Sequence, residues 1–146
     1  MKVQEKISNQ YVIFRMNNEE YGIDIQKVTT IEKLLAVTRV PHAPEAVRGV
    51  INLRGEIIPV VGLAEKLHLG NYTYSDDTRV IIFKIEEISV GFIVDEVAEV
   101  LTISEENIEN ISQVSNDVSI DYILGIGKIK GKIVTLLNLD KLILLK

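Results

Sequence analysis

The chain has no cysteine, which excludes a disulfide framework and a thiolate-bound metal site. No apolar run approaches the roughly 20 residues that a membrane-spanning helix needs. The first ten residues lack the apolar core of a signal peptide. Acidic residues outnumber basic ones by 21 to 16, a balance that does not favour a nucleic-acid backbone as partner. We therefore expect a cytoplasmic protein that neither inserts into a membrane nor binds nucleic acid.

Aromatic residues are also scarce, at 5% of the chain, although hydrophobic residues make up 47%. Valine and isoleucine are abundant, and β-branched side chains favour strands. A chain of 146 residues is long enough for one domain with a substantial core. The composition therefore predicts a mostly β protein that forms a single domain over residues 1–146.

The chain contains an internal repeat in two blocks. GVINLRGEIIPVV at 49–61 matches GIGKIKGKIVTLL at 125–137, each with glycine, five residues, glycine and an apolar run. YVIFRMNNEEYGIDIQKV at 11–28 matches VIIFKIEEISVGFIVDEV at 80–97. Matched residues are 69 positions apart in the block that begins at 11 and 76 positions apart in the block that begins at 49. The second half therefore has about seven extra residues, which we place in the acidic stretch 104–121. The repeat indicates two related halves, and a chance match among strands rich in valine and isoleucine is the alternative.

Each half predicts about five short strands, of which four are clear, and short strands with glycine turns are typical of small barrels or a sandwich. A polar linker at 70–78 separates subdomain one, about 10–69, from subdomain two, about 79–138. Short amphipathic helices are expected at 63–69 and about 139–146. The clear strands are 11–16, 20–25, 50–53 and 56–61 in the first half, and 80–85, 89–94, 123–129 and 132–137 in the second.

The first strand of each half, 11–14 and 80–83, has apolar residues at consecutive positions. A strand with one solvated face would alternate apolar and polar residues. Both faces of these strands should therefore be covered, one by its own barrel and the other by the sister half or a partner. Two halves packed through these strands would leave a groove between them.

Two hairpin turns, Arg54-Gly55 and Lys130-Gly131, join paired strands. A type I′ turn would require positive φ at Arg54 and Lys130, so we expect a type I turn closed by a left-handed glycine. Gly55 and Gly131 are therefore predicted to be structural turn residues, worth about 1 kcal/mol or more. Arg54 is interpreted as functional because a fixed guanidinium makes a directional contact. Lys130 is explained equally well by solubility at a hairpin tip.

The sequence carries no pattern of catalytic or metal-ligating residues. His42 and His68 are not spaced for one helix face and have no adjacent acidic pair. A nucleophile elbow, a dinucleotide fingerprint and a Walker motif are all absent from the sequence. Asp76 and Asp77 lie in the linker, where a solvated turn explains them. We expect no enzymatic activity and no cofactor.

The segment VRGVINLRGEIIPVV at 47–61 resembles the signature of CheW-type chemotaxis coupling proteins. YGIDI at 21–25 and VGFIVDEV at 90–97 resemble the two other recurring segments of that family, at fitting separations. The same domain ends the kinase CheA and begins CheV, but here it makes up the whole chain, as in a stand-alone coupling protein. The resemblance implies two SH3-like five-stranded β-barrel subdomains packed together, with short helices and a shared hydrophobic interface.

The resemblance also implies partners. The protein would be an adaptor that couples the cytoplasmic tips of chemoreceptors (methyl-accepting proteins) to the regulatory domain of the histidine kinase CheA, in arrays at the membrane. Kinase docking in the family uses barrel edges from both halves, so the resemblance identifies no individual kinase-binding residues in this chain. Receptor contact in the family uses the groove between the barrels. Carried over by motif position, the receptor-binding residues are Val28, Thr30, Ile31, Gly49, Arg54, Val97 and Val100.

This chain departs from the family pattern at Thr30, where glutamate is common, and the departure weakens the case for a polar receptor contact there. Gly62 replaces a usual aspartate, and Ala64 replaces a usual basic residue. A double β-barrel that binds a small ligand, without a signalling partner, remains the alternative function. A deep closed pocket with convergent polar groups would favour the ligand, and an open apolar groove would favour the adaptor.

Overall fold

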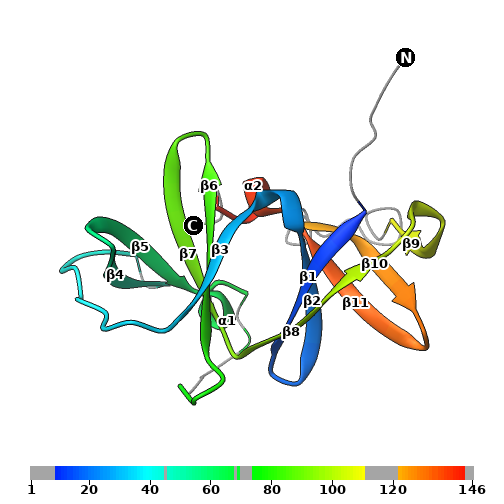
Figure 1. Ribbon diagram of the computed structural model, residues 1–146, viewed down its shortest axis with the longest axis horizontal. Helices are drawn as coiled ribbons and strands as arrows, with labels where there is room; N and C mark the ends of the chain where they lie inside the picture. The colour runs from blue at the N-terminus through cyan, green and yellow to red at the C-terminus, as the bar shows by residue number, and fades with distance from the viewer. Residues whose placement is uncertain (1–8, 45, 68, 70–73, 111–121, 144–146) are drawn as a thin grey trace.

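The computed structural model describes residues 9–44, 46–67, 69, 74–110 and 122–143. These residues are mostly β, as predicted, and form two sheets with the strand orders β8-β1-β2-β11-β10-β9 and β3-β6-β7-β5-β4. Figure 1 shows the two sheets as lobes side by side. The strands are β1 (Gln10–Met16), β2 (Glu19–Asp24), β3 (Val28–Lys33), β4 (Val47–Leu53), β5 (Glu56–Gly62), β6 (Arg79–Ile85), β7 (Ile88–Val94), β8 (Glu96–Thr102), β9 (Ile108–Glu109), β10 (Ile123–Ile129) and β11 (Lys132–Leu137).

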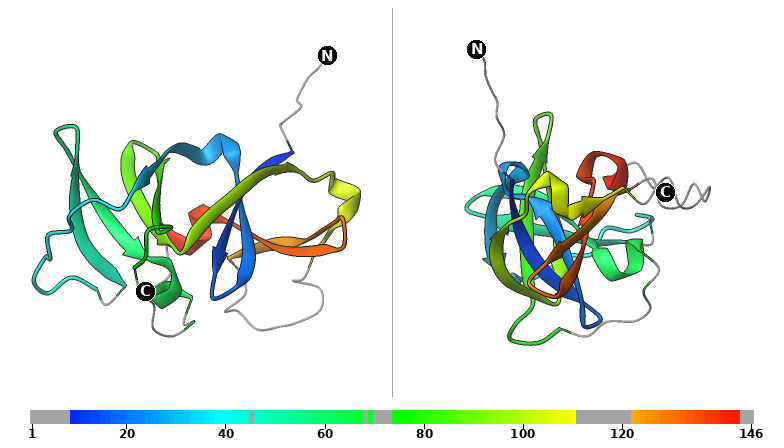
Figure 2. Two further views of the ribbon diagram at one scale, coloured as in Figure 1. Left: turned by 60° about the horizontal axis from the view of Figure 1, so that its bottom comes forward. Right: turned by 90° about the vertical axis from the view of Figure 1, so that its right-hand side faces the viewer.

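Each sheet closes into a small barrel. In the five-stranded barrel, the chain beyond β3 returns to β4 through a bridge between Thr38 and Val50. In the six-stranded barrel, β8 continues through a 3-10 turn at Glu105–Asn107 into β9, which pairs with β10. Because β9 extends the path of β8, both barrels have the same layout (Figure 2).

Sheet membership differs from the expected subdomain boundaries, 10–69 and 79–138. The first hairpin, β1–β2, lies in one sheet with β8–β11, and the hairpin β6–β7 lies in the other with β3–β5. The two halves of the repeat thus exchange their first hairpins. The exchange is held by parallel pairing of β2 with β11 and of β7 with β5. A repeat in sequence cannot reveal it, because exchanging equivalent hairpins leaves the pattern of residues unchanged.

Buried side chains form three clusters, one inside each barrel and a larger one between the barrels. On β6, Val80 and Ile82 lie inside the five-stranded barrel, whereas Ile81 and Phe83 lie in the shared cluster. On β1, Ile13 and Phe14 divide between the barrel core and the shared cluster in the same way. The consecutive apolar residues of these two strands are therefore covered on both faces. The shared cluster takes Phe14, Met16, Tyr21, Ile23, Leu137, Leu139 and Leu142 from one side, and Val61, Leu63, Ala64, Leu67, Ile81, Phe83, Phe92 and Val94 from the other.

The glycine turns differ in type from the prediction. Arg54 and Gly55 have φ of 52° and 91°, and Lys130 and Gly131 have φ of 51° and 78°. Positive φ at both residues of a two-residue hairpin loop defines a type I′ turn, so the expected type I turn is wrong. The I′ turn matches the twist of the strands, which offsets a cost of about 1–2 kcal/mol for a left-handed residue with a side chain. Asn52 supports the first turn, since its Oδ1 accepts a hydrogen bond of 2.8 Å from the Gly55 N–H.

The helices follow the last strand of each half, as predicted. Helix α1 (Leu63–Lys66) is shorter than the expected 63–69, and α2 (Leu139–Ile143) begins at the expected residue. The Asn138 side chain caps α2 by accepting a hydrogen bond of 3.2 Å from the Lys141 N–H. Residues 144–146 and most of the acidic stretch, 111–121, lie outside the described residues. No helix in the described part of the chain has the length and apolar character to cross a membrane.

Candidate functional site

Strand β3 carries two predicted binding residues that point toward the boundary between the barrels. Val28 lies opposite Phe83 and Ile31 lies opposite Ile81, and directly opposed residues of antiparallel strands point to the same side. Phe83 and Ile81 belong to the shared cluster, so Val28 and Ile31 face the seam between the barrels. A bulge between Val28 and Thr30 inserts one residue, which is why residues three apart share a face.

Strand β8 repeats this arrangement on the other barrel. Val97 lies opposite Phe14 and packs against the shared cluster, and Val100 lies opposite Val12 beyond a second bulge. Ile31 and Val100 are 38% and 47% exposed, so the seam has an accessible apolar border on both strands. We call Val28, Ile31, Val97 and Val100 the seam surface.

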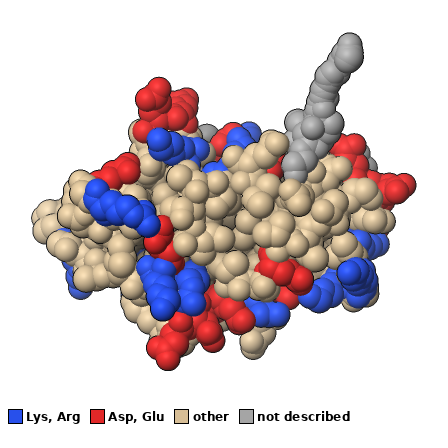
Figure 3. Space-filling view, viewed as in Figure 1, with Lys and Arg blue, Asp and Glu red and all other residues tan. Residues whose placement is uncertain are grey.

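On the face shown in Figure 3, an uncharged area spans the middle of the molecule and most of the charged side chains lie around its border. Such an area favours binding of an apolar partner surface, because few charged groups have to lose their hydration when the partner covers the area.

Thr30 lies on the other face of β3, away from the seam. It is opposite Ile82, which belongs to the core of the five-stranded barrel. Its hydroxyl donates a hydrogen bond of 3.0 Å to Oε2 of Glu32. The same oxygen accepts from Nη1 and Nη2 of Arg54, each at 3.5 Å. Thr30, Glu32 and Arg54 thus form a polar group beside the β4–β5 turn, which we call the turn-side triad.

Glu32 was not predicted as a site residue. The sequence would have indicated it only if a strand over 28–33 had been assigned, because a residue two positions after Thr30 on one strand shares its face. The side chain of Glu32 is 18% exposed, whereas that of Arg54 is 74% exposed. The triad therefore joins a mostly buried carboxylate to a guanidinium in solvent.

Gly49, another predicted binding residue, is buried and has φ of 147°. A Cβ at this position would lie 2.1 Å from the carbonyl oxygen of Thr38. Thr38 and Val50 exchange two backbone hydrogen bonds, of 2.9 and 2.8 Å, that close the barrel. The geometry gives Gly49 a structural role in this closure, and its contact with a partner stays a prediction.

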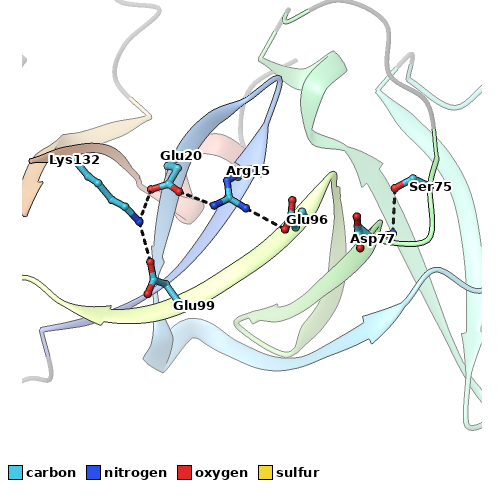
Figure 4. A network of polar contacts seen from close by, with 7 residues as sticks. All are labelled: Arg15, Glu20, Ser75, Asp77, Glu96, Glu99 and Lys132. Carbon is cyan, nitrogen blue, oxygen red and sulfur yellow. Dashed lines mark hydrogen bonds and ion pairs between the residues drawn. The ribbon is translucent and has the colours of Figure 1, made fainter. Parts of the chain in front are cut away.

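A network of five charged side chains crosses the six-stranded barrel (Figure 4). Arg15 pairs with Glu20 at 3.3 Å and Glu96 at 3.0 Å, while Lys132 pairs with Glu99 at 3.1 Å and with Glu20 at 3.7 Å. The hydrogen bond with Glu99 and the charge of Glu20 raise the pKa of Lys132, so the lysine stays charged. The repeat places a serine at the position of Glu20, so the two barrels differ in charge here.

Three of the most exposed large apolar side chains lie on barrel strands, away from β3 and β8. Ile57, Ile88 and Ile133 are 60%, 62% and 65% exposed. Ile57 lies on β5 and Ile88 on β7, each three residues before the paired Val60 and Gly91 of these neighbouring strands. These two exposed aliphatic side chains lie on the same barrel, and we call them together the barrel patch.

Two surface hollows hold about 500 and 440 Å³. Charged residues contribute to the lining of both, and neither is lined by residues of β3 or β8. The seam surface is thus an exposed apolar border and does not coincide with either hollow. The first hollow is lined by Arg15, Asn18, Glu19, Glu20, Lys132, Ile133 and Thr135, and the second by Val37, Arg39, Val47, Arg48, Glu65 and Tyr74.

The comparisons with known proteins agree on one family. The family model of the CheW-like domain matches residues 10–145. The chemotaxis protein CheW of Bacillus subtilis is 40% identical over 127 residues, covering 85% of this chain and 81% of that protein. CheW of Klebsiella aerogenes is 34% identical over 139 residues, covering 95% and 84%. The crystal structure of the scaffolding protein TtCheW from Thermoanaerobacter tengcongensis is similar with a TM-score of 0.83 and 36% identity, covering 94% of this chain and 89% of that one.

Proposed function

Because the chain belongs to the CheW-like family and is a chemotaxis adaptor of that family, we propose that it couples two specific partners. These are the cytoplasmic tips of chemoreceptors and the regulatory domain of the histidine kinase CheA. The adaptor acts from the cytoplasm, is recruited to receptor arrays at the membrane, and transmits signals by binding without chemistry of its own. The observation that carries the proposal is the seam surface, an accessible apolar border on equivalent strands of both barrels.

The receptor tip binds at the seam surface. An amphipathic helical segment buries an apolar stripe against such a surface, with anchors spaced along one helix face. Ile31 and Val100 supply exposed aliphatic contacts from the two barrels, and Val28 and Val97 lie deeper against the shared cluster. Arg54 lies near Thr30 and Glu32 on the other face of β3 and adds a charged contact where the receptor tip extends past that strand.

The kinase regulatory domain binds at the barrel patch formed by Ile57 and Ile88. These residues lie on β5 and β7, whereas the seam surface lies on β3 and β8. The separation leaves both surfaces open to their partners at the same time. Each contact is small, and an array strengthens small contacts through simultaneous engagement of many copies.

Val100→Glu tests the seam surface. We expect the affinity for a purified chemoreceptor tip to fall at least about tenfold, because the new carboxylate must lose its water against an apolar partner. Val100 is 47% exposed, so the melting temperature should change little. Isothermal titration of the receptor tip into the variant measures the loss.

Ile133→Glu provides the matched control. Ile133 is 65% exposed and lies on β11, away from the seam, so this variant should bind the receptor tip like the wild type. Equal losses in the two variants would show that added charge alone weakens binding. Wild-type affinity of Val100→Glu would contradict the receptor-binding role of the seam.

A further inference from the structure

Arg54 is presented to solvent by a rigid turn. Leu53 pairs with Glu56, which leaves only Arg54 and Gly55 in the loop between β4 and β5. Asn52 Oδ1 holds the Gly55 N–H at 2.8 Å, so the backbone that carries Arg54 is fixed. The side chain itself is long, and its guanidinium needs a second support to keep one position.

Glu32 on strand β3 supplies that support. It lies opposite Val80, whose side chain is fully buried in the core of the five-stranded barrel. One oxygen, Oε2, accepts from both Nη atoms of Arg54 at 3.5 Å, which is an end-on contact with the guanidinium. The Thr30 hydroxyl donates to the same oxygen at 3.0 Å and so orients the carboxylate.

We propose that Glu32, oriented by Thr30, is a positioning residue that holds the Arg54 guanidinium for a carboxylate of the receptor tip. The inference rests on the proposed receptor-binding function. An arginine has five N–H donors, and the end-on contact leaves the edge that carries Nε free for a bidentate carboxylate. The partner group is therefore acidic, and it meets an arginine whose direction is already set.

Stability does not explain this arrangement. An ion pair with a largely exposed arginine contributes about 0–1 kcal/mol, and the exposed fraction of Arg54 is 74%. Setting the direction of the guanidinium, in contrast, lowers the entropy that a partner contact must overcome. The triad also accounts for Thr30, since the acid expected at 30 stands two residues later on the same face.

A double-mutant cycle on the full chain tests the coupling. Glu32→Gln should weaken binding of a purified chemoreceptor tip about two- to fivefold, and Arg54→Ala at least as much. The double variant should bind no more weakly than Arg54→Ala, because Glu32 acts through Arg54. A further loss from Glu32→Gln in the Arg54→Ala background would overturn the positioning role.

Moving the acid to another position on the same strand face distinguishes a positioning role from a merely structural role of Glu32. Only a positioning role predicts that receptor-tip binding recovers. Thr30→Glu combined with Glu32→Gln returns an acid to the same face of β3, and binding should recover to within about twofold of wild type. Glu109→Gln is the matched control, since Glu109 pairs with Lys128 at 2.6 Å on the other barrel, and it should leave binding unchanged. Failure of the relocated acid to recover binding would contradict the proposal.

Arginine side-chain NMR separates this inference from the proposed function. In the free protein, Glu32→Gln should broaden or shift the Arg54 guanidinium signals and reduce their order, with no partner present. Unchanged signals would overturn the positioning role even if the receptor tip binds. Absence of receptor binding in the wild type would contradict the proposed function and leave the NMR result to decide the positioning role.

Discussion

Replacing Phe83 with alanine should lower the free energy of unfolding by about 3–5 kcal/mol. The Phe83 side chain is fully buried, and its ring centroid lies 4.7 Å from that of Phe92. Loss of the ring leaves a cavity in the cluster that both barrels share, so the barrels lose packing against each other. Urea denaturation measures the loss, and unfolding should remain one transition with a lower midpoint.

Amide hydrogen exchange shows whether the cluster joins the barrels. Phe83→Ala should reduce protection in the six-stranded barrel as well as in its own five-stranded barrel, because the cluster belongs to both. Ile82→Val is the control, since Ile82 lies only in the core of the five-stranded barrel, and it should cost about 0.5–1.5 kcal/mol. Loss of protection confined to the five-stranded barrel in Phe83→Ala would contradict a shared core.

Replacing Gly49 with alanine should cost about 2–4 kcal/mol. Its Cβ would lie 2.1 Å from the Thr38 carbonyl oxygen, so the Thr38–Val50 bridge must open or shift. The backbone φ of 147° adds strain for any residue with a side chain. Thermal unfolding measures the loss of stability.

Gly55→Ala separates strain from the steric clash. Gly55 has φ of 91°, and a Cβ there would meet no atom within 4 Å, so the cost should be only about 1–2 kcal/mol. Gly49→Ala should therefore be the less stable variant. Wild-type stability of Gly49→Ala together with lost receptor binding would show that Gly49 acts as a contact residue, against the closure role.

The hairpins were predictable from sequence because they carry local signals. Consecutive apolar residues marked the first strand of each half, and the glycine of each Arg-Gly or Lys-Gly turn marked a tip. Strands β3 and β8 were not assigned, since both are partly buried or exposed along their whole length and show no long apolar run. The hairpin exchange and the type I′ turns depend on tertiary packing and strand twist, which local residue patterns do not encode.

The candidate site was predicted as one set and lies in three places. Four residues share the seam surface because a bulge in each pairing changes the register. Thr30 and Arg54 lie in the turn-side triad, which Glu32 completes, and Gly49 lies in the barrel closure. Motif position carries over the residue numbers, but the face of the strand on which each residue lies depends on the bulges, which no motif records.

Simultaneous binding of both partners tests the account most directly. Sedimentation velocity of the full chain, mixed with a chemoreceptor tip and the CheA regulatory domain, should show a ternary complex. Ile88→Glu should lose the kinase domain and keep the receptor tip, and Val100→Glu should do the reverse, because the two side chains lie on different strands, β7 and β8. Displacement of one partner by the other, with no ternary complex at saturating concentrations, would contradict two separate surfaces.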